Sequence, residues 1–201
     1  HAAAAWGSAG GDVHSVSHSY MDRHQSAVLA VAQCAGDIER VADICATALL
    51  AGNKILICGN GGSAADAQHM AAELVGRFVS DRRALAAIAL TTDTSALTAI
   101  ANDYGYDDVF SRQVTALARS GDVLLGISTS GNSGSILAAC DAGRSVGCHV
   151  LGLTGRDGGL LTDRCDAVVI AATQETAHIQ ECHIIVIHLL CALIEQGLDL
   201  A

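Results

Sequence analysis

The feature that most constrains the fold is a repeated alternation of short, nearly uncharged apolar runs with longer segments of helical spacing. The apolar runs cover residues 54–58, 86–91, 123–128, 149–154 and 167–171. Strands that are buried on both faces of a parallel sheet have this continuous apolar character, and helices connect them. The sequence therefore predicts an α/β fold: a single doubly wound domain with a mostly parallel five-stranded sheet flanked by helices.

The segments around the apolar runs carry apolar residues at three- and four-residue steps, which indicates helices. Over residues 17–50 this pattern is interrupted by Gly36, which we expect to divide the region into two helices. Further helices are expected at residues 63–78, 95–101, 107–118, 133–146 and 176–196. Residues 1–16, rich in Ala, Gly and Ser, are expected to be a flexible N-terminal segment, with the folded domain over residues 17–201.

Composition excludes several classes of protein. The 201 residues are 51% apolar, enough for one core, and 21 acidic against 11 basic residues give a net charge of -10, which disfavours nucleic acid as a partner. No apolar stretch reaches the roughly 18 residues that cross a bilayer, so no membrane partner is expected. The eight cysteines include no C-x-x-C pair and lie mostly in apolar runs, which favours buried thiols in a reducing cytoplasm.

A glycine-rich loop, Gly59-Asn-Gly-Gly-Ser63, follows the first predicted strand, and Ser63 is positioned to cap the next helix. In an open α/β sheet, ligands bind beyond the carboxyl ends of the strands, so backbone N–H groups of this loop can hold an anion. The loop also satisfies the dinucleotide pattern G-x-G-x-x-A. No acidic residue ends the next strand to bind a ribose, which disfavours nicotinamide, and ordinary turn glycines remain the alternative.

A second loop contains four hydroxyl side chains in six residues. It reads Ser128-Thr-Ser-Gly-Asn-Ser133, follows the apolar run at residues 123–127 and precedes a helix. Hydroxyls and free N–H groups at a helix N-terminus can bind a phosphate without Lys or Arg. A serine-rich capped turn is the alternative, but such turns seldom need four hydroxyls. The two loops together predict a phosphorylated small molecule as ligand.

Histidine and carboxylate side chains recur on two predicted helices. His69 and Glu73 are four residues apart and share one helix face, where both can reach one ion; a surface hydrogen bond is the alternative. The last helix carries Gln180 and His188, the latter in an apolar stretch where a core histidine is the alternative. Eight residues span about 12 Å of helix axis. Either the helix bends near Gln180, or Gln180 and His188 serve sites in different subunits, at an interface.

Five segments, in this order, resemble the motifs of the phosphoheptose isomerase (sedoheptulose 7-phosphate isomerase) family of sugar-isomerase (SIS) domains. They are GNGGSAADAQH at residues 59–69, LTTDTS at 90–95, NDYG at 102–105, GISTSGNS at 126–133 and IQECH at 179–183. The resemblance covers roughly residues 20–198. Several long motifs in order are far more specific than one glycine fingerprint, which many folds share.

The resemblance implies a bacterial enzyme of heptose biosynthesis that interconverts sedoheptulose 7-phosphate and D-glycero-D-manno-heptose 7-phosphate. It also implies a homotetramer with sites at subunit interfaces, and one zinc ion per subunit. The implied metal ligands are His69, Glu73, Gln180 and His188. The implied substrate contacts are Asn60, Gly61, Gly62, Ser63, Glu73, Asn102, Asp103, Ser128, Thr129, Ser130, Ser133 and Gln180.

The residue chemistry agrees with that activity. An aldose–ketose isomerisation needs a base to move a proton between adjacent carbons and an acid or a Lewis acid to manage the oxygens. We expect Glu73 to be the base and His188 the acid, with a metal ion that polarises the carbonyl and stabilises an enediolate.

Two other functions compete with this one. A non-catalytic SIS-domain protein could bind a replication initiator or sense a sugar phosphate, but it would need no acid, base or metal ligands. An isomerase of a different sugar phosphate is the nearer alternative, because both loops would bind the phosphate whatever the length of the sugar.

Overall fold

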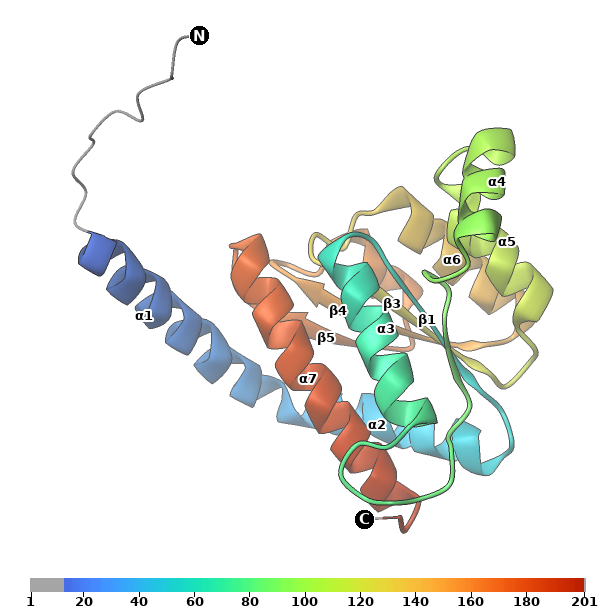
Figure 1. The fold of residues 1–201 in the computed structure, drawn as a ribbon, viewed down its shortest axis with the longest axis horizontal. Coiled ribbons are helices and arrows are strands. Elements are labelled where there is room, and N and C mark those ends of the chain that lie inside the picture. The colour runs from blue at the N-terminus through green and yellow to red at the C-terminus, as the bar shows by residue number, and fades with distance from the viewer. Residues whose placement is uncertain (1–12, 201) are drawn as a thin grey trace, which may run out of the picture.

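The computed structural model describes residues 13–200 and shows a five-stranded, fully parallel sheet with helices on both faces (Figure 1). The strand order is β2-β1-β3-β4-β5. The predicted α/β fold is therefore confirmed. The strands are β1 (Ile55–Gly59), β2 (Ala87–Ala89), β3 (Val123–Ser128), β4 (His149–Gly155) and β5 (Ala167–Ala171).

The helices lie between the strands, largely where the periodicity predicts them. One short 3-10 helix, η2 (Gly159–Arg164), was not expected from the sequence. The others are α1 (Val13–Val31), η1 (Ala32–Cys34), α2 (Ala35–Leu50), α3 (Gly62–Val75), α4 (Thr94–Tyr104), α5 (Asp108–Leu117), α6 (Gly134–Val146) and α7 (Thr176–Gly197).

The apolar residues of the strands alternate between two cores, one on each face of the sheet. Ile55 and Ile57 pack with residues of α2, α3 and α7, whereas Leu56 and Cys58 pack with residues of α5 and α6. All four side chains are fully buried. Burial on both faces explains why the strands read as unbroken apolar runs rather than as alternating patterns.

The strand order creates a crevice between β1 and β3. From β1 the chain crosses over to β2 on one side, and β3 then lies on the other side, with Ile55 opposite Val123 and Gly59 opposite Ile127. Connections that leave two adjacent parallel strands in opposite directions open a space beyond their carboxyl ends, where ligands bind in this type of fold. Both polar loops predicted to hold an anion begin at this edge.

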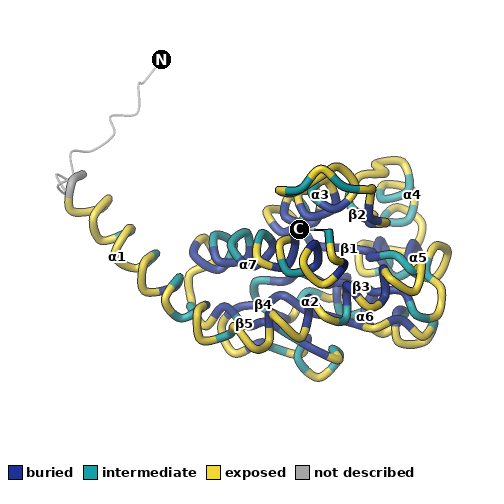
Figure 2. The backbone as a smooth tube through the Cα atoms, turned by 90° about the horizontal axis from the view of Figure 1, so that it is seen from below, coloured by how far each residue is buried: buried dark blue, intermediate teal, exposed yellow. Residues whose placement is uncertain are grey.

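The N-terminal helices differ in detail from the prediction. α1 extends away from the rest of the molecule and is largely exposed (Figures 1 and 2). The break between it and α2 falls at η1, not at Gly36, which lies inside α2. A single glycine costs a helix only about 1 kcal/mol, and the packing of α2 on the sheet offsets this. Residues 1–12 of the expected flexible segment lie outside the described residues, and residues 13–16 belong to α1.

α7 corrects the expectation that no segment is long and apolar enough to span a bilayer. By length and composition alone its 22 residues pass that test, because the apolar run tolerates a few polar residues. Half of its most apolar window is nevertheless buried inside the molecule, and its buried residues include His178, His183 and Glu195. α7 is thus a core helix of this domain. The eight cysteines, all within the described residues, are free thiols, and six of them are buried.

Candidate active site

The two predicted loops meet beyond β1 and β3 and enclose a polar cavity of about 210 Å³. We call this cavity and its lining the cradle. It confirms that the loops are neighbours, and it is also lined by the side chain of Gln180 from the first turns of α7. The lining residues are Asn60, Ser63, Ile127, Ser128, Thr129, Ser130, Ser133 and Gln180.

Glycine shapes the cradle at two turns. Gly61 has φ +57° and ψ -120°, and Gly131 has φ +66°, conformations that side chains rarely permit. A Cβ atom on Gly131 would also lie 1.9 Å from the carbonyl oxygen of Gly158, and one on Gly62 would lie 2.4 Å from Gln180 Nε2. The glycines therefore allow η2 and α7 to close on the loops.

The expected capping role of Ser63 is wrong. Gly61 is the N-cap of α3, so Ser63 lies inside the first turn, where its backbone N–H donates to Asn60 O at 3.0 Å. Gly61 is the N-cap because the glycine turn is tighter than the sequence pattern indicates, so the cap lies two residues earlier than expected. The Ser63 side chain is thereby left to line the cradle, where it is 3% exposed as a residue.

Asn60 organises the hydroxyl groups of the cradle. Its Nδ2 donates to Ser133 Oγ and Ser135 Oγ, both at 2.9 Å, and Tyr106 Oη donates to Asn60 Oδ1 at 2.8 Å. The sequence analysis missed Tyr106 and Ser135. Ser135 continues the hydroxyl pattern two residues after Ser133 and could have been included, whereas nothing in the sequence links Tyr106 to Asn60.

The cradle is built to hold an anion through neutral donors. The N-terminus of α3 begins at Gly62 and that of α6 at Gly134, so both helices present unpaired backbone N–H groups near the two loops. The dipole of each helix places about half a positive charge there. A phosphate can therefore bind without a lysine or arginine side chain, and no such side chain lines the cavity.

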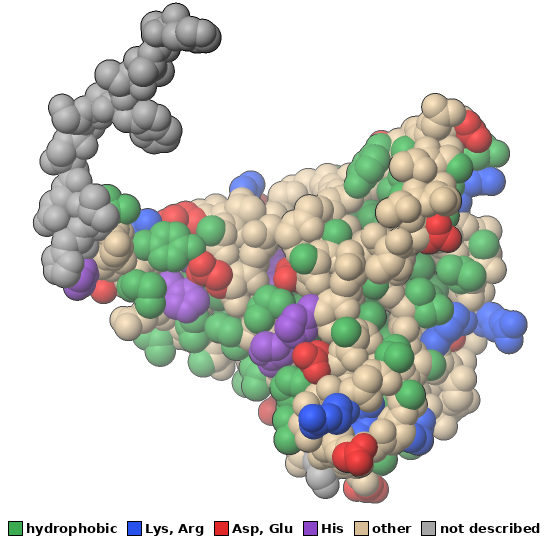
Figure 3. Space-filling view, viewed as in Figure 1, with side chains coloured by type: hydrophobic (Ala, Val, Ile, Leu, Met, Phe, Trp, Pro, Cys, Tyr) green, Lys and Arg blue, Asp and Glu red, His purple; other side chains and the backbone are tan. Residues whose placement is uncertain are grey.

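A second group of predicted residues, which we call the acid–base group, lies farther along α3 and α7. His69 Nε2 is 3.0 Å from His188 Nε2 and 3.2 Å from Glu73 Oε1. The side chains of His69 and Glu73 are 41% and 26% exposed. Figure 3 shows histidine and acidic side chains gathered on this face of the molecule. One chain thus brings together an imidazole pair and a carboxylate that solvent and ligands can reach.

A buried ion pair supports the two helices that carry this group. Arg82 Nε lies 2.9 Å from Glu195 Oε1 on α7, and both side chains are 2% exposed. The guanidinium also donates to Glu73 O at 2.9 Å and to Leu74 O at 2.8 Å, which are among the last carbonyls of α3. Burial opposes ionisation of Glu195, but backbone N–H donors and Arg82 lower its pKa overall. Arg82 therefore caps α3 and ties it to α7, a role that the sequence analysis missed.

Asp66 lies on α3 between the cradle and the acid–base group. The residue is 6% exposed, and its Oδ2 atom is buried without a hydrogen-bond partner. Burial raises the pKa of this carboxyl to about 6, against the lowering effect of His69. Such a group destabilises the fold once it ionises, and a carboxylate of this kind is frequent near functional sites.

The structure separates Gln180 from the other three predicted metal ligands. Gln180 lines the cradle beside Gly62, whereas His188 meets His69, and α7 runs without a break between them. Eight residues of helix correspond to about 12 Å. α7 is continuous through Gln180, so no break in the helix brings Gln180 toward His188, and a role for Gln180 as a metal ligand stays a prediction.

Asn102 and Asp103 are predicted substrate contacts that lie outside both the cradle and the acid–base group. Both are exposed on α4, and Asn102 Nδ2 donates to Asp103 Oδ1 at 2.8 Å. Among the described residues, α4 has none that is buried. These two side chains face away from the core of their own chain and are open to another molecule.

Comparisons with known proteins agree with the motifs. The SIS domain family matches residues 19–155. A phosphoheptose isomerase of Aliarcobacter butzleri is 53% identical over 177 residues, which cover 88% of this chain and 94% of the relative. The chain belongs to the phosphoheptose isomerase family. A relative of the same name from Helicobacter hepaticus is 59% identical over 158 residues, 79% of this chain and 81% of the relative.

Solved structures of phosphoheptose isomerases also superpose on this chain. A phosphoheptose isomerase from Neisseria gonorrhoeae superposes with a TM-score of 0.87 at 45% identity and covers 92% of this chain and 99% of the other. One from Francisella tularensis has a TM-score of 0.86 at 37% identity, over 89% and 96% of the two chains. The expectation of an aldose–ketose isomerase with a SIS fold is thereby confirmed. Structural neighbours below 25% identity, such as a sugar-binding protein of Salmonella typhimurium, support the fold alone.

Proposed function

We propose that this phosphoheptose isomerase interconverts sedoheptulose 7-phosphate and D-glycero-D-manno-heptose 7-phosphate, with the phosphate in the cradle and the chemistry at the acid–base group. The observation that carries this assignment is the polar cavity at the carboxyl ends of β1 and β3, lined by four hydroxyl side chains of one loop and by Asn60 of the other. The names of the close relatives support the heptose phosphate as substrate.

Glu73 is the proposed base. Conversion of the ketose to the aldose removes a proton from C1 and returns one to C2, so a single carboxylate can perform both transfers if it lies over the C1–C2 bond. His188 is the proposed acid and would move a proton between the oxygens on these carbons through the ring nitrogen that does not bind the metal ion. General acid–base catalysis of this kind contributes about 10²- to 10⁴-fold in rate.

The acid–base group also has the chemistry of a zinc site. Two imidazole nitrogens and one carboxylate oxygen converge on a common point, and all three ligand atoms lie within 4.8 Å of one another. This donor set fits zinc and leaves a position for substrate. We propose that His69, Glu73 and His188 hold one zinc ion per subunit, which would polarise the sugar carbonyl.

We further propose that the working site is shared between subunits of a homotetramer. About 12 Å of α7 separates Gln180 from His188, which is the reason to assign the cradle and the acid–base group that face one sugar to different chains. In this arrangement Gln180 completes the ligand set of a neighbour's zinc, and the exposed Asn102 and Asp103 contact substrate across the interface.

An apolar groove between the N-terminal helices and α7 supports this assembly. It has a volume of about 370 Å³ and lies between the helices that flank η1 and the exposed side of α7. Apolar surface of this kind is typical of subunit contacts. A cytoplasmic location completes the proposal.

The direct test is to incubate purified, zinc-loaded protein with sedoheptulose 7-phosphate and to follow the aldose product. We expect turnover that a chelator abolishes and that added zinc restores. Turnover that persists after the zinc content has fallen to zero would refute the metal-assisted mechanism. If another ketose phosphate is converted but sedoheptulose 7-phosphate is not, the assigned substrate is wrong.

A further inference from the structure

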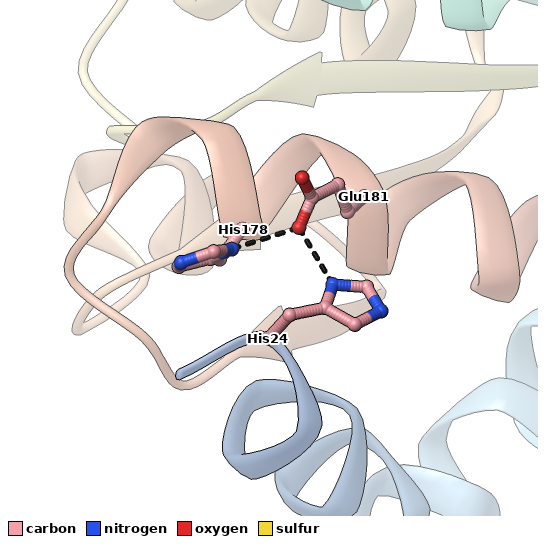
Figure 4. Close-up of side chains that lie close together, drawn as sticks. All are labelled: His24, His178 and Glu181. Atoms are coloured by element: carbon pink, nitrogen blue, oxygen red, sulfur yellow. Dashed lines mark hydrogen bonds and ion pairs between the residues drawn. The ribbon is translucent and has the colours of Figure 1, made fainter. Parts of the chain in front are cut away.

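A second group of convergent imidazole and carboxylate side chains lies between α1 and α7. It consists of His24 on α1 together with His178 and Glu181 on α7, and Figure 4 shows all three pointing toward one another. Glu181 Oε2 lies 2.7 Å from His24 Nδ1 and 2.8 Å from His178 Nδ1. One carboxylate oxygen therefore meets two imidazole nitrogens that come from different helices.

We propose that His24, His178 and Glu181 form a second binding site for a divalent transition metal, best suited to zinc, that fastens α1 to α7. Two imidazole nitrogens and a carboxylate oxygen are a ligand set that zinc accepts, with water in the fourth position. The three ligand atoms lie within 4.8 Å of one another. Ligand atoms around tetrahedral zinc are ~3.3 Å apart, which follows from bonds of about 2.0–2.1 Å.

The burial of the three side chains suits an ion that enters from solvent. The side chain of His178 is 1% exposed and is a fixed anchor, whereas those of His24 and Glu181 are 28% and 32% exposed. The two outer ligands can therefore move apart by the few tenths of an ångström that separate hydrogen-bond distances from the spacing around a metal ion. The net charge of -10 on the chain also favours a cation.

The surroundings of His178 supply an independent observation. Its Nε2 atom is buried and has no hydrogen-bond partner, but Glu175 Oε2 lies 3.5 Å away. Metal-bound histidines characteristically donate their second ring N–H to a carboxylate. If Nδ1 binds the ion, the proton resides on Nε2 and faces Glu175, which is the arrangement typical of metal-bound histidines.

The neighbours of the two carboxylates hold them in place. Arg23 Nε is 2.7 Å from Glu175 Oε1, which leaves the other oxygen of Glu175 for His178. Tyr20 Oη donates to Glu181 Oε1, which leaves Oε2 of Glu181 for the ion. Outer partners of this kind orient metal ligands and increase metal affinity about 10- to 100-fold.

This site is separate from the acid–base group. His178 and His188 are ten residues apart on α7, about 15 Å along the helix axis. One ion cannot bind both, so the chain would bind two metal ions. A metal ion at this position would fix the start of α7 against α1. Gln180 lies between the two α7 ligands and lines the cradle, so this wall of the cradle would be held in place as well.

The test is a count of zinc ions in the full-length protein. Chelator-treated protein is dialysed against a zinc buffer, and zinc per subunit is measured by elemental analysis. We expect two ions in the unmodified protein, one in His24→Gln, one in His69→Gln and none in the double variant. His149→Gln, which removes an exposed histidine at the start of β4, serves as the matched control and should retain two.

A second readout does not depend on enzymatic turnover. Cobalt bound to the His69→Gln variant should give the visible absorption of a four-coordinate site, and the additional His24→Gln or Glu181→Gln change should remove it. If His24→Gln binds as many ions as the unmodified protein and leaves the cobalt spectrum unchanged, the second site does not exist. Loss of an ion in His24→Gln but not in His69→Gln would instead overturn the metal at the acid–base group and leave this proposal intact.

Discussion

The cradle and the acid–base group both include residues of α3 and α7 but are supported in different ways. The cradle is formed by loops whose side chains bond to one another, as Asn60 does to Ser133 and Ser135. The acid–base group lies on exposed helix surface and depends on a buried ion pair, Arg82–Glu195, beneath it. A binding site can thus be specified locally by a loop sequence, whereas a group that must converge from two helices depends on distant contacts that hold the helices together.

This difference explains how much of the site the sequence predicts. Ser128 to Ser133 are close in sequence and become the wall of one cavity, so their pattern is sufficient. The pairing of His69 with Glu73 follows from helical spacing, but the addition of His188 depends on how α7 packs against α3. Arg82 and Glu195 are 113 residues apart, and no local pattern connects them.

The same reasoning applies to the fold. Four of the five strands were predicted to within one or two residues, because burial on both faces makes their apolar runs continuous. The strand after α3 was predicted to cover six residues and forms only three, at the edge of the sheet, where Ile88 is 40% exposed. The sequences of η2 and of the break at η1 show no periodic pattern of apolar residues, because packing against the rest of the domain determines these two features.

The largest expected effect comes from Glu73→Gln. Loss of the base and of one proposed zinc ligand should lower kcat by at least about 10²- to 10⁴-fold, while KM for sedoheptulose 7-phosphate changes little because the cradle is intact. Steady-state kinetics give both values, and circular dichroism reports the fold. Asp43→Asn, at an exposed position on α2 outside the apolar groove, is the matched control. A large increase in KM without a decrease in kcat would show that Glu73 binds substrate instead.

Arg82→Met tests the support of the acid–base group. The change leaves the Glu195 carboxylate buried without its ionic partner and removes the cap of α3, and we expect a loss of about 3–5 kcal/mol in the free energy of unfolding. Urea denaturation measures this loss. Arg83→Met, at the exposed neighbouring position, should cost less than about 0.5 kcal/mol. Equal stability of the two variants would contradict the importance of the ion pair.

Ser130→Ala should affect binding more than chemistry. Removal of one hydroxyl donor to a charged phosphate costs about 1.5–3 kcal/mol, so we expect KM to rise by about 10-fold or more, with a smaller change in kcat. Ser145→Ala, on the exposed side of α6, is the control. If both variants retain the KM of the unmodified protein, the phosphate does not bind in the cradle.

Asp66→Asn tests the carboxyl that lies between the two regions. Because burial raises the folded-state pKa of Asp66 to about 6, the native state of the unmodified protein binds the extra proton and loses stability as pH rises from about 4 to about 6. Above pH 6 the variant should therefore be more stable by up to about 3 kcal/mol. Thermal unfolding at pH 4.5 and pH 7.5 checks this. A variant that is less stable at pH 7.5 would show that the ionised carboxylate has a partner.

The account's central claim is that binding and chemistry belong to two separate regions that neighbouring subunits bring together, and mixed assembly tests it most directly. Glu73→Gln and a cradle variant, Ser128→Ala combined with Ser130→Ala, are each nearly inactive in this account. Co-expression of the two chains, with separate affinity tags to isolate the mixed oligomer, should restore a substantial fraction of the activity, because some sites then contain an intact cradle and an intact acid–base group. A mixed oligomer that is as inactive as its two parents would contradict the shared site.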